Sequence, residues 1–521
     1  MDVNSYIHTL CKKGEGTEIE FKSAKGGFPG SFWETYSAFA NTDGGIIVLG
    51  ISEKNGKFYP DGLSEEQIAK LKKLLWDGLN NKNTVSTCII SESDVLQANV
   101  ENGFALVVKV PRAEYTQRPV YLTLNPFGGH MFRRRHEGDY KVGDDVVRRI
   151  MGESQIADHP LDNYVFPSFI LGEEIDQDTV SQYRRLFDAK NQEHPWSELD
   201  DLSFLKKIGA YGKDSDSGKE GFTLAGVLMF GTQKGLDDAI PYYYVDYREK
   251  MSDDPEIRWT DRVYIDGYWE PNLFQFYNRV YLKIRQALPV PFKLDGIVRV
   301  DYTPAHKALR EAIINCLVHA RYGMMNNIVI ERYPDKLVFV NPGTMLISVE
   351  QFFAGGTSIC RNFGLQKMFS FIGYVERAGS GADTITKGWK ENNWPKPQIR
   401  EIYDPDRVEM VLSLHGLEGD LRKDGTTQKT TTETTTETTI ETFKKTSELI
   451  LDTIKKNPSL TNKELAAICG ITTDGVYYQL KQLKASGKIR RIGPNKGGHW
   501  EVIIDRRELF SRLMRIDSHF W

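Results

Sequence analysis

The chain has 521 residues, of which 40% are hydrophobic and 26% charged, values that are ordinary for folded proteins and exclude wholesale disorder. Its 67 basic and 71 acidic side chains give a formal charge of −4, so any affinity for nucleic acid must come from local basic patches. The sequence has no run of about 18 apolar residues and no secretory signal pattern, so we expect a soluble, cytoplasmic protein.

A short strand and a helix open the interpretable part of the chain. Ile19 and Phe21 alternate with polar residues, so a period of two places the apolar pair on one face and Glu20 and Lys22 on the other. Glu15 precedes this strand and can fold back toward Glu20. A helix with inward-facing aromatic residues follows, ends at a glycine-rich turn and leads into a buried strand.

These segments resemble the AlbA-like domain of the Schlafen family over residues 10–145. The family motifs are present as Glu15…Glu20-Phe21-Lys22, Ser37–Gly45 and Ile46–Ile51. The resemblance implies nucleic-acid binding, and animal relatives use the paired glutamates with a third acid as a metal-dependent ribonuclease centre. On that interpretation Glu15, Glu20 and Lys22 are catalytic, and Glu15 and Glu20 hold Mg²⁺ or Mn²⁺.

The third acidic position is the weak part of such a nuclease centre. Where the family often has aspartate, this chain has Ser52 followed by Glu53. Because neighbouring strand residues point to opposite faces of a sheet, Glu53 is not an obvious replacement. The alternative to a metal site is a solvated strand face that carries a Glu–Lys pair.

A basic stretch ends this first domain, which we place at residues 1–155. Arg133, Arg134 and Arg135 are candidate contacts to nucleic-acid phosphates. Side chains that follow one another on a strand face opposite ways, so not all three arginines can reach one ligand. An exposed, charge-balanced surface is the alternative.

Residues 156–295 are richer in aromatic side chains, and we expect a central mixed α/β domain there. The runs Gly221–Gly231 and Tyr242–Arg248 have the composition typical of strands. The family resemblance implies a homo-oligomer, for which this aromatic region is a possible interface. The segment Gly212–Glu220 imitates a P-loop but ends in glutamate where serine or threonine is required, so we do not expect motor activity.

A helix is predicted for residues 305–320, where Leu309, Ile313 and Leu317 recur at helical spacing. Glu311 and Asn315 are four residues apart and share one face beside this apolar stripe. In that arrangement the amide oxygen of Asn315 can ligate Mg²⁺ on a triphosphate while the Glu311 carboxylate orients water. Asn315 is therefore a candidate metal ligand and Glu311 a candidate catalytic residue.

Two further motifs follow this helix: Asn341-Pro342-Gly343 ends a strand pair, and Gly379 and Gly381 precede a helix whose first amides can approach phosphate. With the E-A-I-I-N-C-L-V-H run from Glu311, these motifs resemble the divergent Bergerat-type ATP-binding domain of the gyrase–kinase–chaperone superfamily, which we place at residues 296–415. The resemblance implies ATP with Mg²⁺ and adds two residues from the segment between the motifs. The candidate nucleotide-binding residues are Asn315, Asn341, Gly343, Arg361, Asn362, Gly379 and Gly381.

Asn341 departs from that family pattern, because ATPases of the superfamily read adenine with an aspartate at this place. An amide has both a donor and an acceptor, so it can still hydrogen-bond a base, but it carries no charge. Nucleotide binding without hydrolysis and a purely structural domain are therefore alternatives to an ATPase.

A threonine-rich segment separates the last module from the rest. Eleven of the seventeen residues from Thr426 to Thr442 are threonine. Such a tract cannot bury enough surface to offset the entropy of ordering it, so we predict a linker at residues 416–445. An extended strand is the alternative.

Residues 446–521 follow the order of helices and hairpin found in winged helix-turn-helix regulators, and they resemble that class throughout. Between residues 446 and 500, nine Lys and Arg oppose four Asp and Glu, a local charge of +5 that favours DNA binding. A protein-docking role is the alternative. The candidate DNA contacts are Thr473, Tyr477, Tyr478, Lys481, Arg490, Arg491 and Lys496.

The sequence thus predicts an α+β multidomain protein. The first hypothesis is an ATP-binding, nucleic-acid-binding regulator, acting on transcription or foreign DNA, whose nucleotide state modulates DNA engagement. The second is a Schlafen-like metal-dependent nuclease gated by ATP in antiphage defence. The third is an ATPase scaffold that drives assembly.

Overall fold

The computed structural model describes residues 3–414 except 157–159, 215–216, 253, 255, 287, 289–293, 296–297, 300–302, 357–358 and 376–380; further along it describes residues 453–455, 460–461, 464–466, 476, 480, 483–484, 489–492 and 499–502. The chain forms two compact units, Met1–Lys423 and Asp424–Trp521. Among the described residues, no helix combines the length and apolar character that a bilayer span requires.

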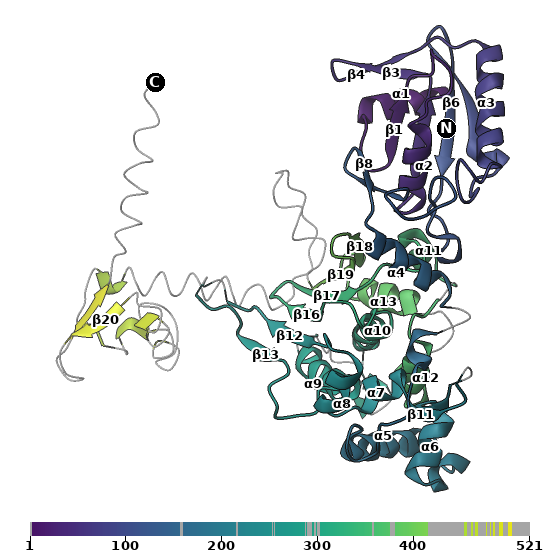
Figure 1. Cartoon of the computed structure of the whole chain (residues 1–521). Coiled ribbons are helices and arrows are strands. Elements are labelled where there is room, and N and C mark those ends of the chain that lie inside the picture. The colour runs from purple at the N-terminus through teal and green to yellow at the C-terminus, as the bar shows by residue number, and fades with distance from the viewer. Residues whose placement is uncertain are drawn as a thin grey trace. The chain divides into compact units, whose positions relative to one another are not determined.

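The N-terminal module, residues 3–154, is built on a four-stranded sheet in the order β1-β2-β6-β5 (Figure 1). β1 pairs with β2 in parallel, and the remaining neighbours are antiparallel. Helices α2 and α3 pack on one face of the sheet and α1 on the other. The elements are α1 (Val3–Lys13), β1 (Ile19–Lys22), α2 (Phe32–Ala40), β2 (Gly45–Leu49), β3 (Ile51–Lys54), β4 (Lys57–Pro60), α3 (Glu65–Leu79), β5 (Val95–Val100), β6 (Gly103–Val110), β7 (Phe132–Arg135), β8 (Gly138–Lys141) and α4 (Asp144–Ser154).

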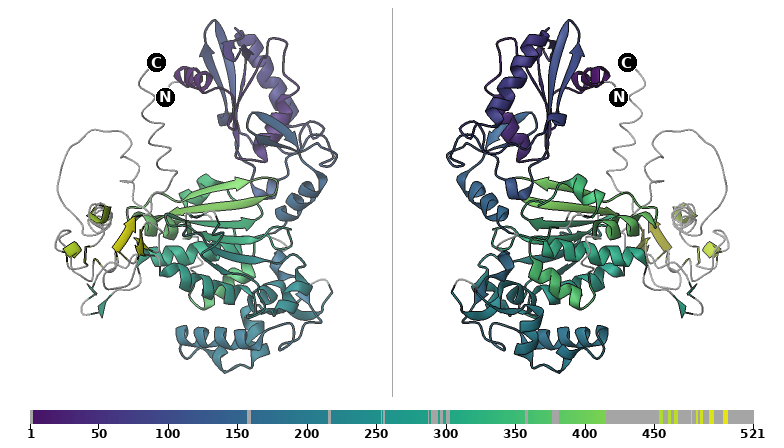
Figure 2. Two further views of the ribbon diagram at one scale, coloured as in Figure 1. Left: turned by 90° about the vertical axis from the view of Figure 1, so that its left-hand side faces the viewer. Right: turned by 90° about the vertical axis from the view of Figure 1, so that its right-hand side faces the viewer.

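The remainder of the first unit is organised around a six-stranded sheet in the order β13-β12-β16-β17-β19-β18 (Figure 2). Helix α10 packs on β17 and against α9 and α13. The elements are β12 (Val245–Glu249), β13 (Asp261–Val263), α9 (Leu273–Arg285), β14 (Leu294–Asp295), β15 (Val298–Arg299), α10 (Pro304–Val318), β16 (Ile328–Arg332), β17 (Lys336–Pro342), α11 (Val349–Ala354), α12 (Phe363–Phe371), α13 (Gly381–Lys390), β18 (Gln398–Ile402) and β19 (Arg407–Ser413).

The expected domain boundary between residues 295 and 296 does not separate two cores. β12, from the expected central domain, pairs in parallel with β16 of the expected ATP-binding domain, with Val245 opposite Ile328. One hydrophobic core runs through both regions, from Ile175 to Leu412. The sequence did not reveal this continuity, because pairing between strands far apart in sequence leaves no local signal.

A three-stranded sheet in the order β10-β11-β9 precedes β12, and the expected strand at residues 221–231 proves to be mainly a helix there. Thr223 Oγ1 accepts a hydrogen bond from Gly226 N at 3.1 Å and begins α7. A short apolar run does not by itself distinguish a buried strand from a buried helix. The elements are β9 (Val165–Phe166), α5 (Gln177–Lys190), α6 (Asp201–Ile208), β10 (Tyr211–Lys213), β11 (Glu220–Thr223), α7 (Leu224–Phe230) and α8 (Gln233–Ala239).

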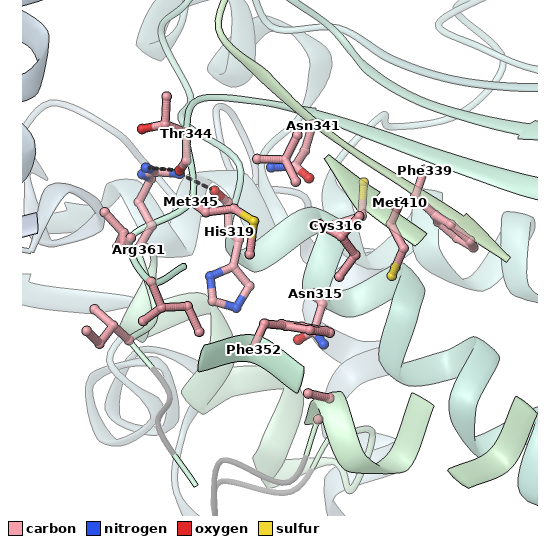
Figure 3. Close-up of a pocket in the computed structure, with 17 residues that line it drawn as sticks. Asn315, Cys316, His319, Phe339, Asn341, Thr344, Met345, Phe352, Arg361 and Met410 are labelled. Atoms are coloured by element: carbon pink, nitrogen blue, oxygen red, sulfur yellow. Dashed lines mark hydrogen bonds between the residues drawn. The ribbon is translucent and has the colours of Figure 1, made fainter. Parts of the chain in front are cut away.

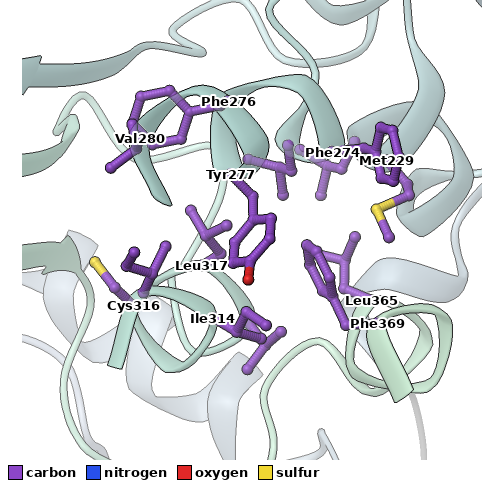
Figure 4. Packing of buried hydrophobic residues seen from close by; sticks show 14 of the residues in the cluster. Met229, Phe274, Phe276, Tyr277, Val280, Ile314, Cys316, Leu317, Leu365 and Phe369 are labelled. Carbon is purple, nitrogen blue, oxygen red and sulfur yellow. The ribbon is translucent and has the colours of Figure 1, made fainter. Parts of the chain in front are cut away.

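Helix α10 is oriented by the packing around Tyr277 of α9 (Figure 4). The Tyr277 ring lies 5.8 Å from the ring of Phe369 and is 1% exposed. Ile314 and Leu317 of α10 belong to the same core. Because these side chains bind α10 to α9 and α12, the neighbouring residues on α10 face the six-stranded sheet.

The C-terminal unit contains a hairpin of β20 (Ile489–Ile492) and β21 (His499–Val502), as the winged-helix pattern predicts. Its described core contains Ile454, Leu465, Val476, Leu480, Leu483 and Ile489. Thr461 and Glu464 form reciprocal side-chain-to-backbone hydrogen bonds, the cap expected before a helix. The predicted linker at residues 416–445 lies outside the described residues.

A buried carboxylate predicts an unusual pH dependence of stability. Asp162 is fully buried at the start of α12, where its Oδ2 accepts from Leu365 N at 3.1 Å, and burial raises its pKa to about 6. The folded protein therefore binds this proton more tightly than the unfolded chain, and stability falls as pH rises from about 4 to about 6. Across this window the unaltered protein should lose about 3 kcal/mol of unfolding free energy because of Asp162, and we expect Asp162→Asn to abolish that loss. Denaturation midpoints at about pH 4 and about pH 7 measure the change.

The exposed Asp335 provides the control, because Asp335→Asn removes a carboxylate that is already solvated. This control variant should retain the pH dependence of the unaltered protein. An Asp162→Asn variant with the same pH dependence as the unaltered protein would contradict the prediction.

Candidate functional site

A cavity of about 120 Å³ lies between the C-terminal part of α10, the end of β17 and the strands β18 and β19. Its walls are mostly apolar, and they include Phe339, Phe352 and Met410. Figure 3 shows Asn315, His319 and Asn341 around the same space, with hydrogen bonds from Arg361 at its edge. The polar lining residues are Asn315, His319, Asn341, Thr344 and Arg361.

Asn315 and Glu311 both lie on α10, but only Asn315 lines the cavity. Glu311 is 9% exposed and is covered by the start of α13: a Cβ on Gly381 would lie 2.5 Å from Glu311 Oε1 and 3.1 Å from Asn315 Nδ2. Glycine is what allows this close approach. Glu311 is therefore next to the cavity-lining Gly381 without being one of the lining residues, and its role in orienting water stays a prediction.

Gly381 lines the cavity at the N-terminus of α13, where the first backbone N–H groups have no partner within the helix. Its role as a phosphate contact stays a prediction. Gly379 lies outside the described residues.

Asn341 lies next to the last residue of β17, opposite Val408 of β19, and it is 7% exposed. Its amide lies in the cavity wall with the apolar side chains of Phe339 and Met410. An amide in this setting can donate to and accept from the edge of a planar ligand.

Arg361 connects two segments of the cavity wall to α4. Its Nη1 donates to His319 O at 2.6 Å, and its Nη2 donates to Thr344 O at 2.8 Å and to Glu153 Oε1 at 3.1 Å. The side chain is fully enclosed. Arg361 therefore lines the cavity as predicted, but its terminal nitrogens hold the wall together.

Two of the predicted nucleotide contacts do not line the cavity, and the structure corrects their assignment. The Asn362 amide donates to Val318 O at 2.9 Å and to Ala320 O at 2.7 Å, which fixes the end of α10. Gly343 has a φ of +105°, and a Cβ there would lie 2.9 Å from Arg361 Nη1. Asn362 thus supports the end of α10, and Gly343 leaves room for the Arg361 side chain.

His319 lines the cavity, and its ionisation is shifted by its surroundings. Burial and the nearby charge of Arg361 lower its pKa to about 4. Its imidazole is therefore neutral near pH 7 and offers the cavity hydrogen-bonding nitrogens without a charge.

Sequence reasoning missed Thr344, Met345, Phe352 and Met410 as lining residues. Asn341 and Asn315 had recognisable motifs, whereas these four are ordinary loop, helix or strand residues in the sequence. Thr344 and Met345 had one signal in the sequence, because they follow Asn341-Pro342-Gly343 directly. Phe352 and Met410 had none. The pairing of β17 with β19 brings Met410 opposite Phe339 and thus into the wall.

The predicted carboxylates of the N-terminal module are bound by the chain itself. Lys22 Nζ lies 2.8 Å from Glu20 Oε1, and Arg134 Nη2 lies 2.7 Å from Glu20 Oε2. Glu15 Oε1 accepts a hydrogen bond from Phe21 N at 3.0 Å. A metal ion at Glu20 would have to displace both cations.

Glu53 lies close enough to Glu15 to affect its ionisation, which the strand pattern did not predict. Burial raises the pKa of Glu15, and the charges of Glu20 and Glu53 raise it further. Even so, the described part of the chain contains no group of three or more His, Cys, Asp or Glu side chains arranged to hold a metal ion.

The three successive arginines are engaged within the protein in this structure, and their role as phosphate contacts stays a prediction. Arg133 is 3% exposed and forms two bonds to Asp406, while Arg134 is 4% exposed and is held by carboxylates of its own module. Arg135 pairs with Asp404 at a more exposed position. The carboxylates that pair with Arg133 and Arg135 lie between β18 and β19, and local sequence could not identify them.

The predicted DNA contacts of the C-terminal unit are only partly described. Arg490 is on β20 and pairs with Glu501 of β21, and its side chain is mainly exposed. Arg491 follows it on the same strand. The other predicted contacts lie outside the described residues: Thr473, Tyr477, Tyr478, Lys481 and Lys496.

Four family models match successive parts of the chain. Residues 15–142 match "Schlafen, AlbA_2" and residues 149–246 match a domain of unknown function. Residues 326–412 match HATPase_c_4, described as "Putative ATP-dependent DNA helicase recG C-terminal", and residues 443–490 match "Winged helix-turn-helix DNA-binding". The predicted order of an AlbA-like Schlafen domain, an ATPase-like domain and a winged helix is confirmed, as is the mixed α/β class.

A comparison with curated proteins found no match to the chain. A crystal structure of the DIP2311 protein from Corynebacterium diphtheriae aligns with 94% of this chain and 95% of that chain, at 15% sequence identity and a TM-score of 0.38. A TM-score this low does not establish a common fold.

Proposed function

We propose that the protein is a cytoplasmic, ATP-binding and nucleic-acid-binding regulator whose nucleotide state modulates its engagement of DNA, in transcription or in defence against foreign DNA. The Schlafen AlbA-like and winged-helix matches support a nucleic-acid partner, and the ATPase-like match supports a nucleotide. The observation that carries the proposal is the cavity that brings Asn315, Asn341 and the N-terminus of α13 together.

The residues of this cavity fit ATP with Mg²⁺. Asn341 would bond the edge of the base between apolar side chains, and Asn315 would offer its amide oxygen to Mg²⁺. The α13 terminus at Gly381 would direct backbone N–H groups at the phosphates. Because a Cβ on Gly381 would lie 3.1 Å from Asn315 Nδ2, glycine is needed for the backbone to come this near the proposed metal ligand.

The ion pairs of Glu20 argue against the nuclease hypothesis. Glu20 is neutralised by Lys22 and Arg134, both within 2.8 Å. A carboxylate that is paired in this way has to exchange two cations for one metal ion before it can act.

A thermal-shift experiment tests nucleotide binding. Saturating ATP with Mg²⁺ should stabilise the unaltered protein by about 2.7 kcal/mol at a hundredfold excess over Kd, and thus raise its Tm by several degrees. Asn315→Ala should remove most of this shift, because it deletes the proposed Mg²⁺ ligand. The measurement compares the Tm in the presence of ATP and Mg²⁺ with the Tm in the presence of ATP alone.

Asn327→Ala is the matched control, because Asn327 is an exposed amide outside the cavity. This variant should keep the full shift. A protein whose Tm does not respond to ATP, or an Asn315→Ala variant with an unchanged response, defeats the proposal.

A further inference from the structure

A short acidic segment closes the β18–β19 hairpin and contacts the N-terminal module (Figures 1 and 2). We call residues 401–406, which read Glu-Ile-Tyr-Asp-Pro-Asp, the hairpin tip. Each of its three carboxylates pairs with arginine from the N-terminal module. We call the arginines that surround the tip the arginine face: Arg112, Arg118, Arg133, Arg135 and Arg149.

Glu401 is held by Arg112 in a two-point contact. Arg112 Nη2 donates to Glu401 Oε1 at 3.0 Å, and Arg112 Nη1 contacts Oε2. This is the fork geometry by which arginine binds either a carboxylate or a phosphate. Burial by itself raises the pKa of Glu401, but Arg112 and Arg118 lower it overall, so the carboxylate is charged at neutral pH.

Asp406 makes a second two-point contact. Arg133 Nη1 and Nη2 donate to its two carboxylate oxygens at 2.7 and 3.2 Å, and Arg149 Nη2 donates at 2.6 Å. The Arg133 guanidinium also lies 4.5 Å from the centre of the Tyr403 ring. Paired anions beside a stacked aromatic ring are what a nucleic-acid strand presents to a protein.

The arginine face carries more positive charge than the tip neutralises, because three tip carboxylates face five arginines. Asp43 lies 3.4 Å from Arg112, and Glu153, whose charge acts on Arg118, is itself paired with Arg321 and Arg361. Arg118 and Arg133 are 6% and 3% exposed, and among the described residues the Nε atoms of Arg112, Arg118 and Arg133 have no hydrogen-bond partner. Buried cations with unused donors are costly, and a denser polyanion would satisfy them better.

We infer that the arginine face is a nucleic-acid-binding surface and that the hairpin tip covers it by imitating the phosphate backbone. The inference deepens the proposed function and rests on it for the nucleic-acid role of the N-terminal module. Four of the five arginines lie within the residues that match the Schlafen AlbA-like model. Release of the tip exposes a cluster of guanidinium groups whose forks fit phosphates.

The same hairpin connects this surface to the cavity. Ile399 of β18 and Met410 of β19 line the cavity. Met345 also lines it, and its backbone oxygen accepts from Arg112 at 2.8 Å and from Arg118 at 3.0 Å. A ligand in the cavity therefore contacts both the strands that carry the tip and the residue that anchors the arginine face.

The test removes the negative charge of the tip in the full-length protein and measures DNA binding without nucleotide. Glu401→Gln combined with Asp406→Asn preserves the size of both side chains. We expect affinity for a short DNA duplex to rise at least about tenfold. The salt dependence of log K should steepen by about 3, because each phosphate contact contributes about 0.9 and the two substitutions release Arg112, Arg133 and Arg149.

Glu409→Gln is the matched control on the same hairpin, because Glu409 pairs with Arg400 and not with the arginine face. Its DNA affinity should not change. Adding Arg112→Ala and Arg133→Ala to the double variant should abolish the gain. Unchanged affinity in the double variant, or a gain that survives the loss of both arginines, overturns the inference.

Asp404→Asn provides an independent variant if the buried double substitution prevents folding. The Asp404 side chain is 56% exposed, and its loss should steepen the salt dependence by about one without affecting the fold. An unchanged salt dependence in this folded variant also overturns the inference. Because no ATP is present, these outcomes are independent of the thermal-shift result for Asn315.

Discussion

An Arg361→Ala variant is expected to lose about 3–5 kcal/mol of unfolding free energy, the usual cost of removing one partner from a buried ion pair. Arg361 is 1% exposed and joins α10, the segment after β17 and α4 through three hydrogen bonds. Its removal leaves Glu153 buried with Arg321, at 3.3 Å, as its remaining described cationic partner. The expected readout is a large fall in the denaturation midpoint.

A double-mutant cycle separates the ion pair from the hydrogen bonds to backbone. Glu153→Gln in the Arg361→Ala background should recover part of the loss, because the buried carboxylate no longer lacks its partner. A loss below about 1 kcal/mol in Arg361→Ala would instead place this contact among the weak pairs typical of protein surfaces. In either case the cavity wall is affected, since Arg361 and Thr344 both line it.

A chain without residues 443–521 is expected to bind duplex DNA at least about a hundredfold more weakly near 0.1 M salt. The deleted residues include the segment with nine Lys and Arg against four Asp and Glu. The described core of the C-terminal unit consists only of its own residues, so the deletion leaves the described core of the first unit intact. Binding isotherms over a salt series measure both the affinity and the number of phosphates that the deleted segment neutralises.

Arg490→Ala with Arg491→Ala supplies a comparison within the full-length chain. Each phosphate that is no longer bound should reduce the salt dependence of log K by about 0.9, so the double variant should show a decrease of up to about 2. If the truncated chain binds duplex DNA as tightly as the full-length chain, the main DNA-binding surface lies in the first unit.

The candidate site was partly predictable because its two amides belong to recognisable local motifs. The helical spacing around Asn315 and the strand end at Asn341 identified these residues, and both line the cavity. The Asn341 motif also suggested Gly343, and the family resemblance added Asn362, but in the structure both support the wall and do not line the cavity. A motif specifies which residues accompany a fold, but it does not separate those that touch a ligand from those that support the ones that do.

The amino-acid sequence by itself determined the local elements and their order. Alternation of apolar and polar residues specified β1, and helical spacing specified α10, because both periods follow from backbone geometry. The succession of an AlbA-like domain, an ATPase-like domain and a winged helix was likewise readable from motifs.

Only the tertiary structure decided how the arginines are used and where the six-stranded sheet begins. Arg133 is recognisable in the sequence as a charged residue on a strand, but the role of its side chain depends on Asp406. The fold brings Asp406 to it from the turn before β19. β12 joins β16 for a similar reason, since strand pairing is set by topology and not by neighbouring residues. Ion pairs and sheet contacts between distant segments form only when packing places them together, and a local pattern does not encode that placement.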